Sequence, residues 1–368
     1  MRVFDKPVID IPAQIALLKQ RGLQIQNEVR AHRFLEAVSY FRLTPYMRTF
    51  QQKEDQDHPF RQGVGFKDLT RLYEFDRRLR LLVIDAIERV EVAVRSRISD
   101  HMGPLHGGHW YLNARLFQHT YDHKRLLETI GVKQDKAKRD YERECQRIDG
   151  LQTSDPRKHK LKHQRARESY ARHYPVNYDS PRLMPGWAML EELTLGDLSH
   201  LFKGLAKDAD KKAIARHFGL PAPLLLSWMH TLTTIRNLCA HHARLWNREL
   251  GIRPELPKKP SFPWPLALVQ ESHHPRIYPV LCILSHLTRR VSPHFRWDIR
   301  LQELMREFRR WTNERWDFRS IGITMFFGVS INSSQKNKKP QCFDIGAFCR
   351  SALLICHSQN TLKKSHLL

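Results

Sequence analysis

Apolar residues at helical spacing mark the first part of the chain. Between residues 12 and 46 they recur every three or four positions, and Gly22 interrupts them in the way that a glycine ends a helix. Two helices are therefore predicted. Residues 51–65 are mainly polar and include two glycines, which predicts a loop. We expect residues 1–60 to form an N-terminal helical segment.

The strongest periodic pattern follows, over residues 66–101. Eight apolar positions fall on one stripe of a helix: Leu72, Phe75, Leu79, Leu82, Ala86, Val90, Val94 and Ile98. This segment is predicted to be one long amphipathic helix. Glu88, Glu91 and Arg95 can pair along one of its faces because they stand three and four positions apart. We interpret them as a supporting ion-pair ladder on the surface, with a catalytic carboxylate as the alternative.

The second half of the chain is also helical in pattern. Helices are predicted near residues 187–193, 195–199, 211–218, 224–250, 278–291 and 297–311, with a proline-rich crossing at 254–265. Strand patterns are few, so the predicted fold class is all-α. We expect the main domain to cover residues 61–328.

The segment Leu224–Leu250 carries the residues with the most chemical interest. Placed on a single helix, it has a packing face and a polar face on opposite sides. The packing face consists of Trp228, Leu232, Ile235, Cys239, His242 and Trp246. The polar face consists of His230, Thr234, Asn237, His241, Arg244 and Arg248. On this placement His242 is a buried packing residue and His241 is the histidine available for chemistry.

This polar face has the side chains that can cleave RNA without a metal. A histidine can accept the 2′-hydroxyl proton or protonate the leaving 5′-oxygen, because imidazole titrates near neutral pH. Arginine can hold a phosphate bidentately and stabilise the negative charge of the transition state. Arg236 lies one position off this face, but its side chain can reach toward Asn237 and His241. A polar helix face with no catalytic role is the alternative interpretation.

Net charge limits the class of partner. The 368 residues include 62 Lys and Arg against 38 Asp and Glu, which gives a formal charge of +24. Such an excess calls for a polyanion, most often nucleic acid and less often an anionic membrane surface. The mean hydropathy is −0.55, no apolar run approaches the ~20 residues of a membrane span, and the first residues lack a secretory signal. We therefore expect a cytoplasmic protein that has no membrane contact.

Part of the charge gathers between residues 131 and 175. We expect this stretch to be a basic helical insertion in the main domain that binds phosphate. The alternative is a charged helix that is solvated and binds no ligand. Its candidate RNA-binding residues are Lys158, Lys160, Lys162 and Arg165. Arg244 and Arg248 are further phosphate-binding candidates. His159 and His163 have the spacing of a metal pair, but flanking cations oppose a divalent ion, so no metal site is expected.

The six cysteines include no CxxC pair and match neither a zinc site nor a disulfide framework. We interpret them as reduced thiols. Three of them lie in residues 329–368, which open polar and basic and lack clear helical periodicity. This atypical tail is predicted to be disordered, and a nucleic-acid-binding extension is the alternative.

A family resemblance covers most of the chain. It is carried above all by residues 236–248, Arg-Asn-Leu-Cys-Ala-His-His-Ala-Arg-Leu-Trp-Asn-Arg, which contain the R-x4-H pattern of the HEPN superfamily. Further similar segments lie at 18–23, 38–43, 73–79, 87–95, 185–191 and 227–232. Over about residues 1–315 the chain resembles the Abi-like proteins of bacterial abortive infection, the group that includes AbiD and AbiF. It departs from their pattern in the basic stretch at 133–172 and after Trp316.

The resemblance implies a more specific fold and activity than the residue pattern does. It implies a HEPN-like helical bundle, with additional N-terminal helices and a basic insertion, that pairs as a homodimer across a composite cleft. It implies a metal-independent endoribonuclease toxin of phage defence that needs no cofactor. On this basis Arg236 would bind phosphate, His241 would act as acid or base, and Asn237 would orient them. Some members of the group are linked to a small non-coding RNA.

Two other functions remain open from the sequence. The chain could be a non-catalytic RNA-binding protein that acts as a ribonucleoprotein with a small non-coding RNA, or a structural helical adaptor for another toxin. Charge supports the enzyme and the RNA-binding protein equally. RNA ends that depend on His241 would separate these two.

Overall fold

A computed structural model describes residues 7–52, 57–265, 268 and 276–308. Within these residues every regular element is a helix, and strand-like pairing is confined to three isolated β-bridges. The α-helices are α1 (Ile11–Gln20), α2 (Glu28–Val38), α3 (Tyr40–Met47), α4 (Phe66–His106), α5 (His123–Asp149), α6 (Asp155–Ala166), α7 (Tyr170–Asn177), α8 (Gly186–Glu191), α9 (Leu195–Gly204), α10 (Asp208–His217), α11 (Ala222–Ala240), α13 (Tyr278–Val291) and α14 (Trp297–Glu307). Three short 3-10 helices, η1 (Trp110–Leu112), η2 (Ala114–Leu116) and η3 (Pro293–Phe295), complete the set. The all-α prediction is confirmed.

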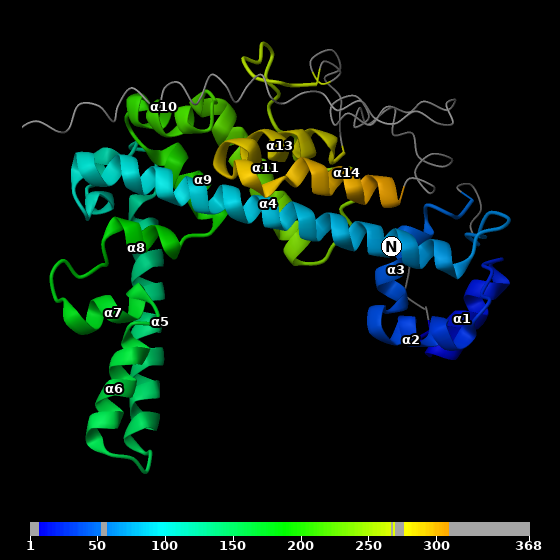
Figure 1. The fold of residues 1–368 in the computed structure, drawn as a ribbon, viewed down its shortest axis with the longest axis horizontal. Helices are drawn as coiled ribbons and strands as arrows, with labels where there is room; N and C mark the ends of the chain where they lie inside the picture. Colours follow the sequence, from blue (N-terminus) through cyan, green and yellow to red (C-terminus); the bar gives the residue numbers. More distant parts are fainter. Residues whose placement is uncertain (1–6, 53–56, 266–267, 269–275, 309–368) are drawn as a thin grey trace, which may run out of the picture. The chain divides into compact units, whose positions relative to one another are not determined.

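Helix α4 organises the core. It has 41 residues, about 60 Å at 1.5 Å per residue, and is the long cyan helix of Figure 1. All eight apolar residues of its predicted stripe are buried. Helices α3, α8, α9, α10, α11, α13 and α14 pack against it. The prediction of one long amphipathic helix is confirmed, and this helix supplies a common surface for the N-terminal and C-terminal halves.

The N-terminal segment forms three helices where two were predicted. Helix α1 ends before Gly22, whose φ of +84° suits glycine because it has no Cβ. The second predicted helix is divided into α2 and α3 at Ser39, which has a φ of +65°. The Ser39 hydroxyl accepts a hydrogen bond from the Arg42 amide at 3.4 Å and so begins α3. The prediction of one helix here is wrong, because a serine is a much weaker break signal than a glycine.

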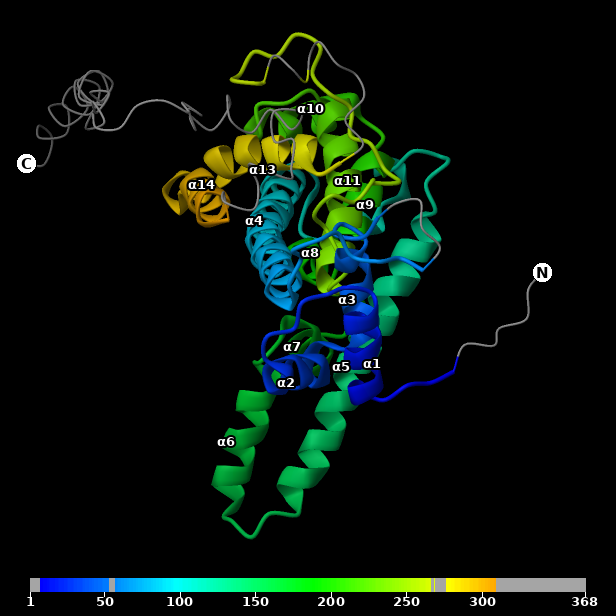
Figure 2. The ribbon, with the colours of Figure 1, turned by 90° about the vertical axis from the view of Figure 1, so that its right-hand side faces the viewer.

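The basic stretch folds into α5 and α6, which lie antiparallel beside each other in Figure 2. Ion pairs tie this hairpin together. Glu144 of α5 lies 3.5 Å from Arg165 Nε of α6 and 3.2 Å from Arg172 Nη2 of α7. Asp149 at the end of α5 lies 2.6 Å from Lys162 Nζ. Much of the charge of this stretch therefore stabilises its own fold.

The second half follows the predicted order of helices, with one difference. Helices α8, α9, α10, α13 and α14 lie where the periodicity placed them, whereas α11 ends ten residues before the predicted Leu250. One hydrophobic core runs from Ile15 to Phe308 and includes residues on both sides of the predicted boundary at residue 60. The division of the chain at that boundary stays a prediction. The predicted tail, 329–368, lies outside the described residues.

Three observations bear on the predicted chemistry of the chain. Cys145, Cys239 and Cys282 are free thiols, and the other three cysteines lie outside the described residues. In the part of the chain that is described, no group of three or more His, Cys, Asp or Glu side chains could hold a metal ion. None of the helices described combines the length and apolar character needed to cross a membrane.

Candidate active site

The end of α11 shapes the candidate site. The helix ends at Ala240 with His241 as its C-cap, and His242 takes the left-handed conformation with a φ of +55°. The amide of His242 donates to the Cys239 carbonyl at 3.0 Å, and the amide of Ala243 donates to the Leu238 carbonyl at 2.9 Å. These two bonds form a Schellman motif, which reverses the chain. The predicted continuation of the helix to Leu250 is therefore wrong.

The early end of α11 changes the environment of His242. The sequence placed this histidine on a buried packing face, but its side chain is exposed. A left-handed residue after a helix is most often glycine, and histidine is one of the few other residues that are enriched there. The pair His241 and His242 contains no glycine, so the sequence gives no clear signal that the helix ends there. The predicted burial of His242 is thus corrected together with the end of the helix.

A buried aspartate of α4 holds the chain after the reversal. Asp76 is fully buried, and its Oδ1 accepts hydrogen bonds from the amides of Leu245 at 3.2 Å and Trp246 at 2.7 Å. The Tyr46 hydroxyl donates to Oδ2 at 2.6 Å, and Arg80 forms an ion pair with the same oxygen. Burial raises the pKa of the Asp76 carboxyl, while Arg80, Tyr46 and the two amides oppose this shift. The carboxylate thereby joins α3, α4 and the segment after α11.

Helix α3 binds the same segment from another side. Arg42 Nη1 donates to the His242 carbonyl at 2.9 Å, and Arg244 Nη1 donates to the Pro45 carbonyl at 3.2 Å. These contacts join residues about two hundred positions apart in the sequence. The backbone from His242 to Trp246, which directly follows His241, is consequently held on both sides.

The three predicted catalytic residues lie at the same end of α11. Asn237 and His241 are exposed and stand one helical turn apart, while Arg236 is half-buried. Arg236 Nη1 lies 3.5 Å from Asn237 Oδ1, at the long limit of a hydrogen bond. This arrangement offers a phosphate-binding cation, an amide and an imidazole to the same external ligand. Cys239 lies between Arg236 and His241 in the sequence, but its thiol is a poor nucleophile because burial raises its pKa to about 12.

Four arginines lie near the segment that follows α11. The predicted Arg244 and Arg248 both lie beyond the helix, half-buried, and Arg42 and Arg48 approach from α3 and its end. Burial lowers the pKa of Arg244, and the positive charges of Arg248 and Arg48 lower it further. The sequence could not associate Arg42 or Arg48 with the motif, since their proximity arises only from the packing of α3.

A family model described as Abi-like protein matches residues 33–247, which include α3, α4, α11 and the segment held by Asp76. The match covers more than half of the chain. The chain belongs to the Abi-like protein family. Membership indicates a role in abortive infection, a bacterial defence against phage. Comparisons with curated proteins and with solved structures gave no match.

The predicted supporting residues of this Abi-like protein lie elsewhere on α4. Glu91 and Arg95 pair at 2.5 Å and are largely buried, so they do not form a surface ladder. Arg95 also donates to the carbonyls of Leu190 at 3.1 Å and Leu193 at 2.9 Å, which satisfies the end of α8. Glu88 is exposed. Glu88 is the nearest of the three to Asp76 and lies about 18 Å from it along the helix at 1.5 Å per residue. Arg95, paired with Glu91, fastens α4 to α8 and the residues after it.

The predicted RNA-binding residues of α6 are mostly engaged within the hairpin. Lys158 donates to the Asp149 carbonyl at 2.9 Å, Lys162 pairs with the Asp149 carboxylate, and Arg165 pairs with Glu144 and Glu168. Lys160 is exposed. Their common location on one hairpin agrees with the sequence pattern, but their ion pairs reduce the charge that they offer to a ligand.

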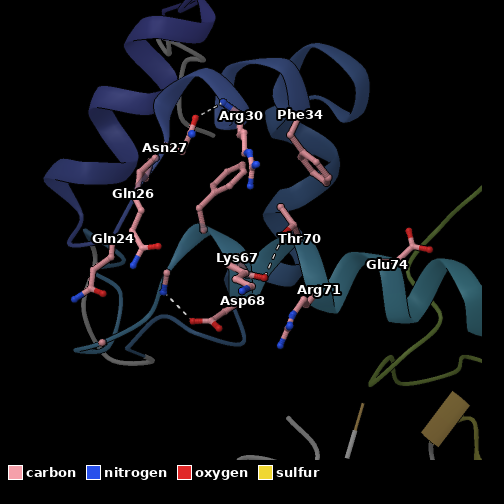
Figure 3. Close-up of a pocket in the computed structure, with 14 residues that line it drawn as sticks. Gln24, Gln26, Asn27, Arg30, Phe34, Lys67, Asp68, Thr70, Arg71 and Glu74 are labelled. Carbon is pink, nitrogen blue, oxygen red and sulfur yellow. Dashed lines mark hydrogen bonds between the residues drawn. The ribbon is translucent and has the colours of Figure 1, made fainter. Parts of the chain in front are cut away.

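A cavity of about 750 Å³ lies between α2 and the start of α4 (Figure 3). Three cations, Arg30, Lys67 and Arg71, line it together with the side chains of Gln24, Gln26, Asn27, Asp68 and Glu74. A chain of rings connects it to the motif segment. Phe34 in the cavity wall meets Tyr73 edge-to-face at 5.9 Å, and Tyr73 meets Tyr46, the Asp76 ligand, at 5.5 Å. A polar cavity that can bind phosphate and base edges therefore adjoins the framework of the candidate site.

Proposed function

We propose that this Abi-like protein is a metal-independent endoribonuclease of the HEPN type and acts as the toxin of an abortive-infection system. Cleavage of cellular RNA would stop growth of the infected cell. The observation that carries the proposal is the exposed corner of Arg236, Asn237 and His241, on a backbone that buried Asp76 holds in place. Such fixed geometry favours catalysis, because the reacting groups need no ordering in the transition state.

The proposed reaction is an internal transfer at the RNA phosphate. The 2′-oxygen attacks phosphorus as its proton passes to a base, and the bond to the 5′-oxygen breaks as that oxygen receives a proton from an acid. The products are a 2′,3′-cyclic phosphate and a 5′-hydroxyl. His241 serves as base or acid, and the His241 of a second copy can serve as the other group in a homodimer. Arg236 stabilises the charge on the phosphate oxygens, and Asn237 orients Arg236.

RNA is the partner that fits the charge. Near the segment that follows α11 lie Arg42, Arg48, Arg244 and Arg248, which we propose bind phosphates beside the cleaved bond. The chain carries a net charge of +24, so association with RNA should weaken steeply with salt.

The test is cleavage of RNA in the presence of EDTA by the wild type and by His241→Ala. The variant should cleave about 10²- to 10⁴-fold more slowly, since general acid-base groups contribute this much. His242→Asn is the matched control, because it removes an adjacent exposed imidazole and keeps a residue suited to the left-handed backbone. It should cleave at nearly the wild-type rate.

Two results would overturn this mechanism. Equal cleavage by His241→Ala and the wild type would exclude a catalytic role for His241. Loss of wild-type activity in EDTA would indicate a metal-dependent reaction. Salt-sensitive RNA binding with no new RNA ends would instead favour a non-catalytic RNA-binding protein.

A further inference from the structure

Helix α7 carries a row of tyrosines outside the candidate active site. Tyr170, Tyr174 and Tyr178 follow one another at intervals of four residues, from the first residue of the helix to its C-cap. The ring centroids are 6.2 Å apart for Tyr170 and Tyr174, and 5.1 Å apart for Tyr174 and Tyr178. The planes are tilted by 34° and 31°. The three rings therefore form a continuous ladder along α7.

The middle ring anchors the ladder and the outer rings face solvent. Tyr174 is buried, and its hydroxyl donates to the Pro181 carbonyl at 2.7 Å. Tyr170 is 40% exposed and Tyr178 is 50% exposed. Two exposed rings on one short helix leave aromatic surface within reach of a ligand.

His173 fixes the outer rings relative to each other. Its ring lies 5.6 Å from Tyr170 and 6.2 Å from Tyr178. The amide nitrogen of Asn177 lies 3.1 Å from His173 Nδ1 and 2.7 Å from the His173 carbonyl, which holds the imidazole in place. The exposed tyrosines thus belong to an ordered cluster of four rings.

The ladder stands beside the most basic part of the chain. Helix α7 packs against α5 and α6, as Figures 1 and 2 both show. Residues 133–172 contain thirteen Lys and Arg against seven Asp and Glu. Exposed cations on or near this hairpin are Lys136, Lys138, Arg139, Arg147, Arg157, Lys160 and Arg167. Aromatic rings and cations are therefore available on neighbouring surfaces.

We infer that the tyrosine ladder of α7 is a stacking surface for the unpaired bases of single-stranded RNA, whose phosphates bind the cations of the α5–α6 hairpin. Exposed rings bind bases without regard to sequence, because every base has a π-face, and cations follow the backbone. Bases inside a duplex are already stacked and cannot reach the rings. The choice of RNA as the polyanion rests on the proposed function, but the ladder itself requires no cleavage.

The test is RNA binding measured by fluorescence anisotropy, with a labelled unstructured RNA and with the same RNA in a duplex. All proteins carry His241→Ala, so that the RNA stays intact. Tyr170→Ala combined with Tyr178→Ala should weaken binding of the single strand about tenfold or more and leave duplex binding nearly unchanged. Tyr170→Phe combined with Tyr178→Phe should bind the single strand like the parent, since stacking needs the ring and not the hydroxyl.

Controls separate stacking from loss of structure. Val176→Ala removes another exposed apolar side chain of α7 and should leave binding unchanged. Thermal unfolding should show that the double alanine variant keeps its fold, because buried Tyr174 remains. Unchanged single-strand binding by the double alanine variant, or an equal loss for both RNAs, would overturn the inference. The binding result is independent of the cleavage test, so either idea can fail alone.

Discussion

Asp76 receives hydrogen bonds from three separate parts of the chain. Tyr46 belongs to α3, Arg80 to α4, and the amides of Leu245 and Trp246 to the segment after α11. Removing charge from such a carboxylate leaves Arg80 buried beside a neutral group. An unpaired buried charge is far more costly than a lost surface pair. Asp76 therefore determines both the stability of this region and the position of the motif.

Asp76→Asn should lower the free energy of unfolding by about 3–5 kcal/mol, because it leaves the buried Arg80 uncompensated. Urea unfolding followed by circular dichroism measures this change. Asp85→Asn is the matched control on the same helix, since Asp85 pairs with Arg89 and Arg300 near the surface and should cost less than about 1 kcal/mol. Similar losses for the two variants would contradict the role assigned to Asp76.

At the scale of elements, the end of α11 determines the arrangement of the candidate site. The polar stripe of the sequence places Asn237 and His241 on one face, and this part of the pattern holds because both precede the reversal. Arg244 and Arg248 follow the reversal, and Arg244 contacts α3 through the Pro45 carbonyl. The helix end thus concentrates residues that a straight helix would spread along its length.

His242→Gly should raise the free energy of unfolding by roughly 0.5–1 kcal/mol, since a left-handed backbone strains an L-residue and not glycine. Ala240→Gly, two residues earlier in the helical region, should lower it. Chemical unfolding of both variants tests this expectation. If both glycines destabilise the protein equally, the left-handed strain at His242 is not significant.

At the scale of the whole molecule, His286 of α13 connects several segments of the core. It is buried, and its Nε2 lies 2.9 Å from the Phe218 carbonyl after α10. Its ring lies 5.7 Å from Trp228 of α11 and 4.0 Å from Phe262 of the proline-rich crossing. Burial lowers the pKa of His286, and the charges of Arg290 and Arg289 lower it further. The folded protein therefore favours the neutral imidazole.

This shift predicts a loss of stability in acid. The unfolded chain binds the proton of His286 more readily than the folded chain, so the stabilisation is complete above the ordinary histidine pKa of about 6.5 and declines as the pH falls below it. His286→Asn keeps a side-chain donor and removes this titration. Unfolding free energies measured between neutral and mildly acidic pH should fall less steeply for the variant. Parallel pH profiles would show that His286 does not contribute.

Part of the candidate site could be predicted from the sequence. Arg236, Asn237 and His241 were identified because they lie close together on one helix, where spacing determines geometry. Asp76 and Arg80 are not singled out by the pattern, although both fall beside the apolar stripe of α4 at a spacing that lets them pair. Arg42 and Arg48 carried no signal, because nothing near them in the sequence indicates contact with residues two hundred positions later.

The all-α class, the long helix α4 and the spacing of the motif residues on α11 can all be predicted from the sequence alone, and the net charge favours a polyanionic partner. These follow from periodicity, spacing and charge, which are local or summed properties of the chain. The end of α11 at Ala240, the binding of the following chain by Asp76 and the contact of Arg42 with the His242 carbonyl emerge only in the folded protein. Those features depend on hydrogen bonds and packing between remote segments, which a local pattern does not encode.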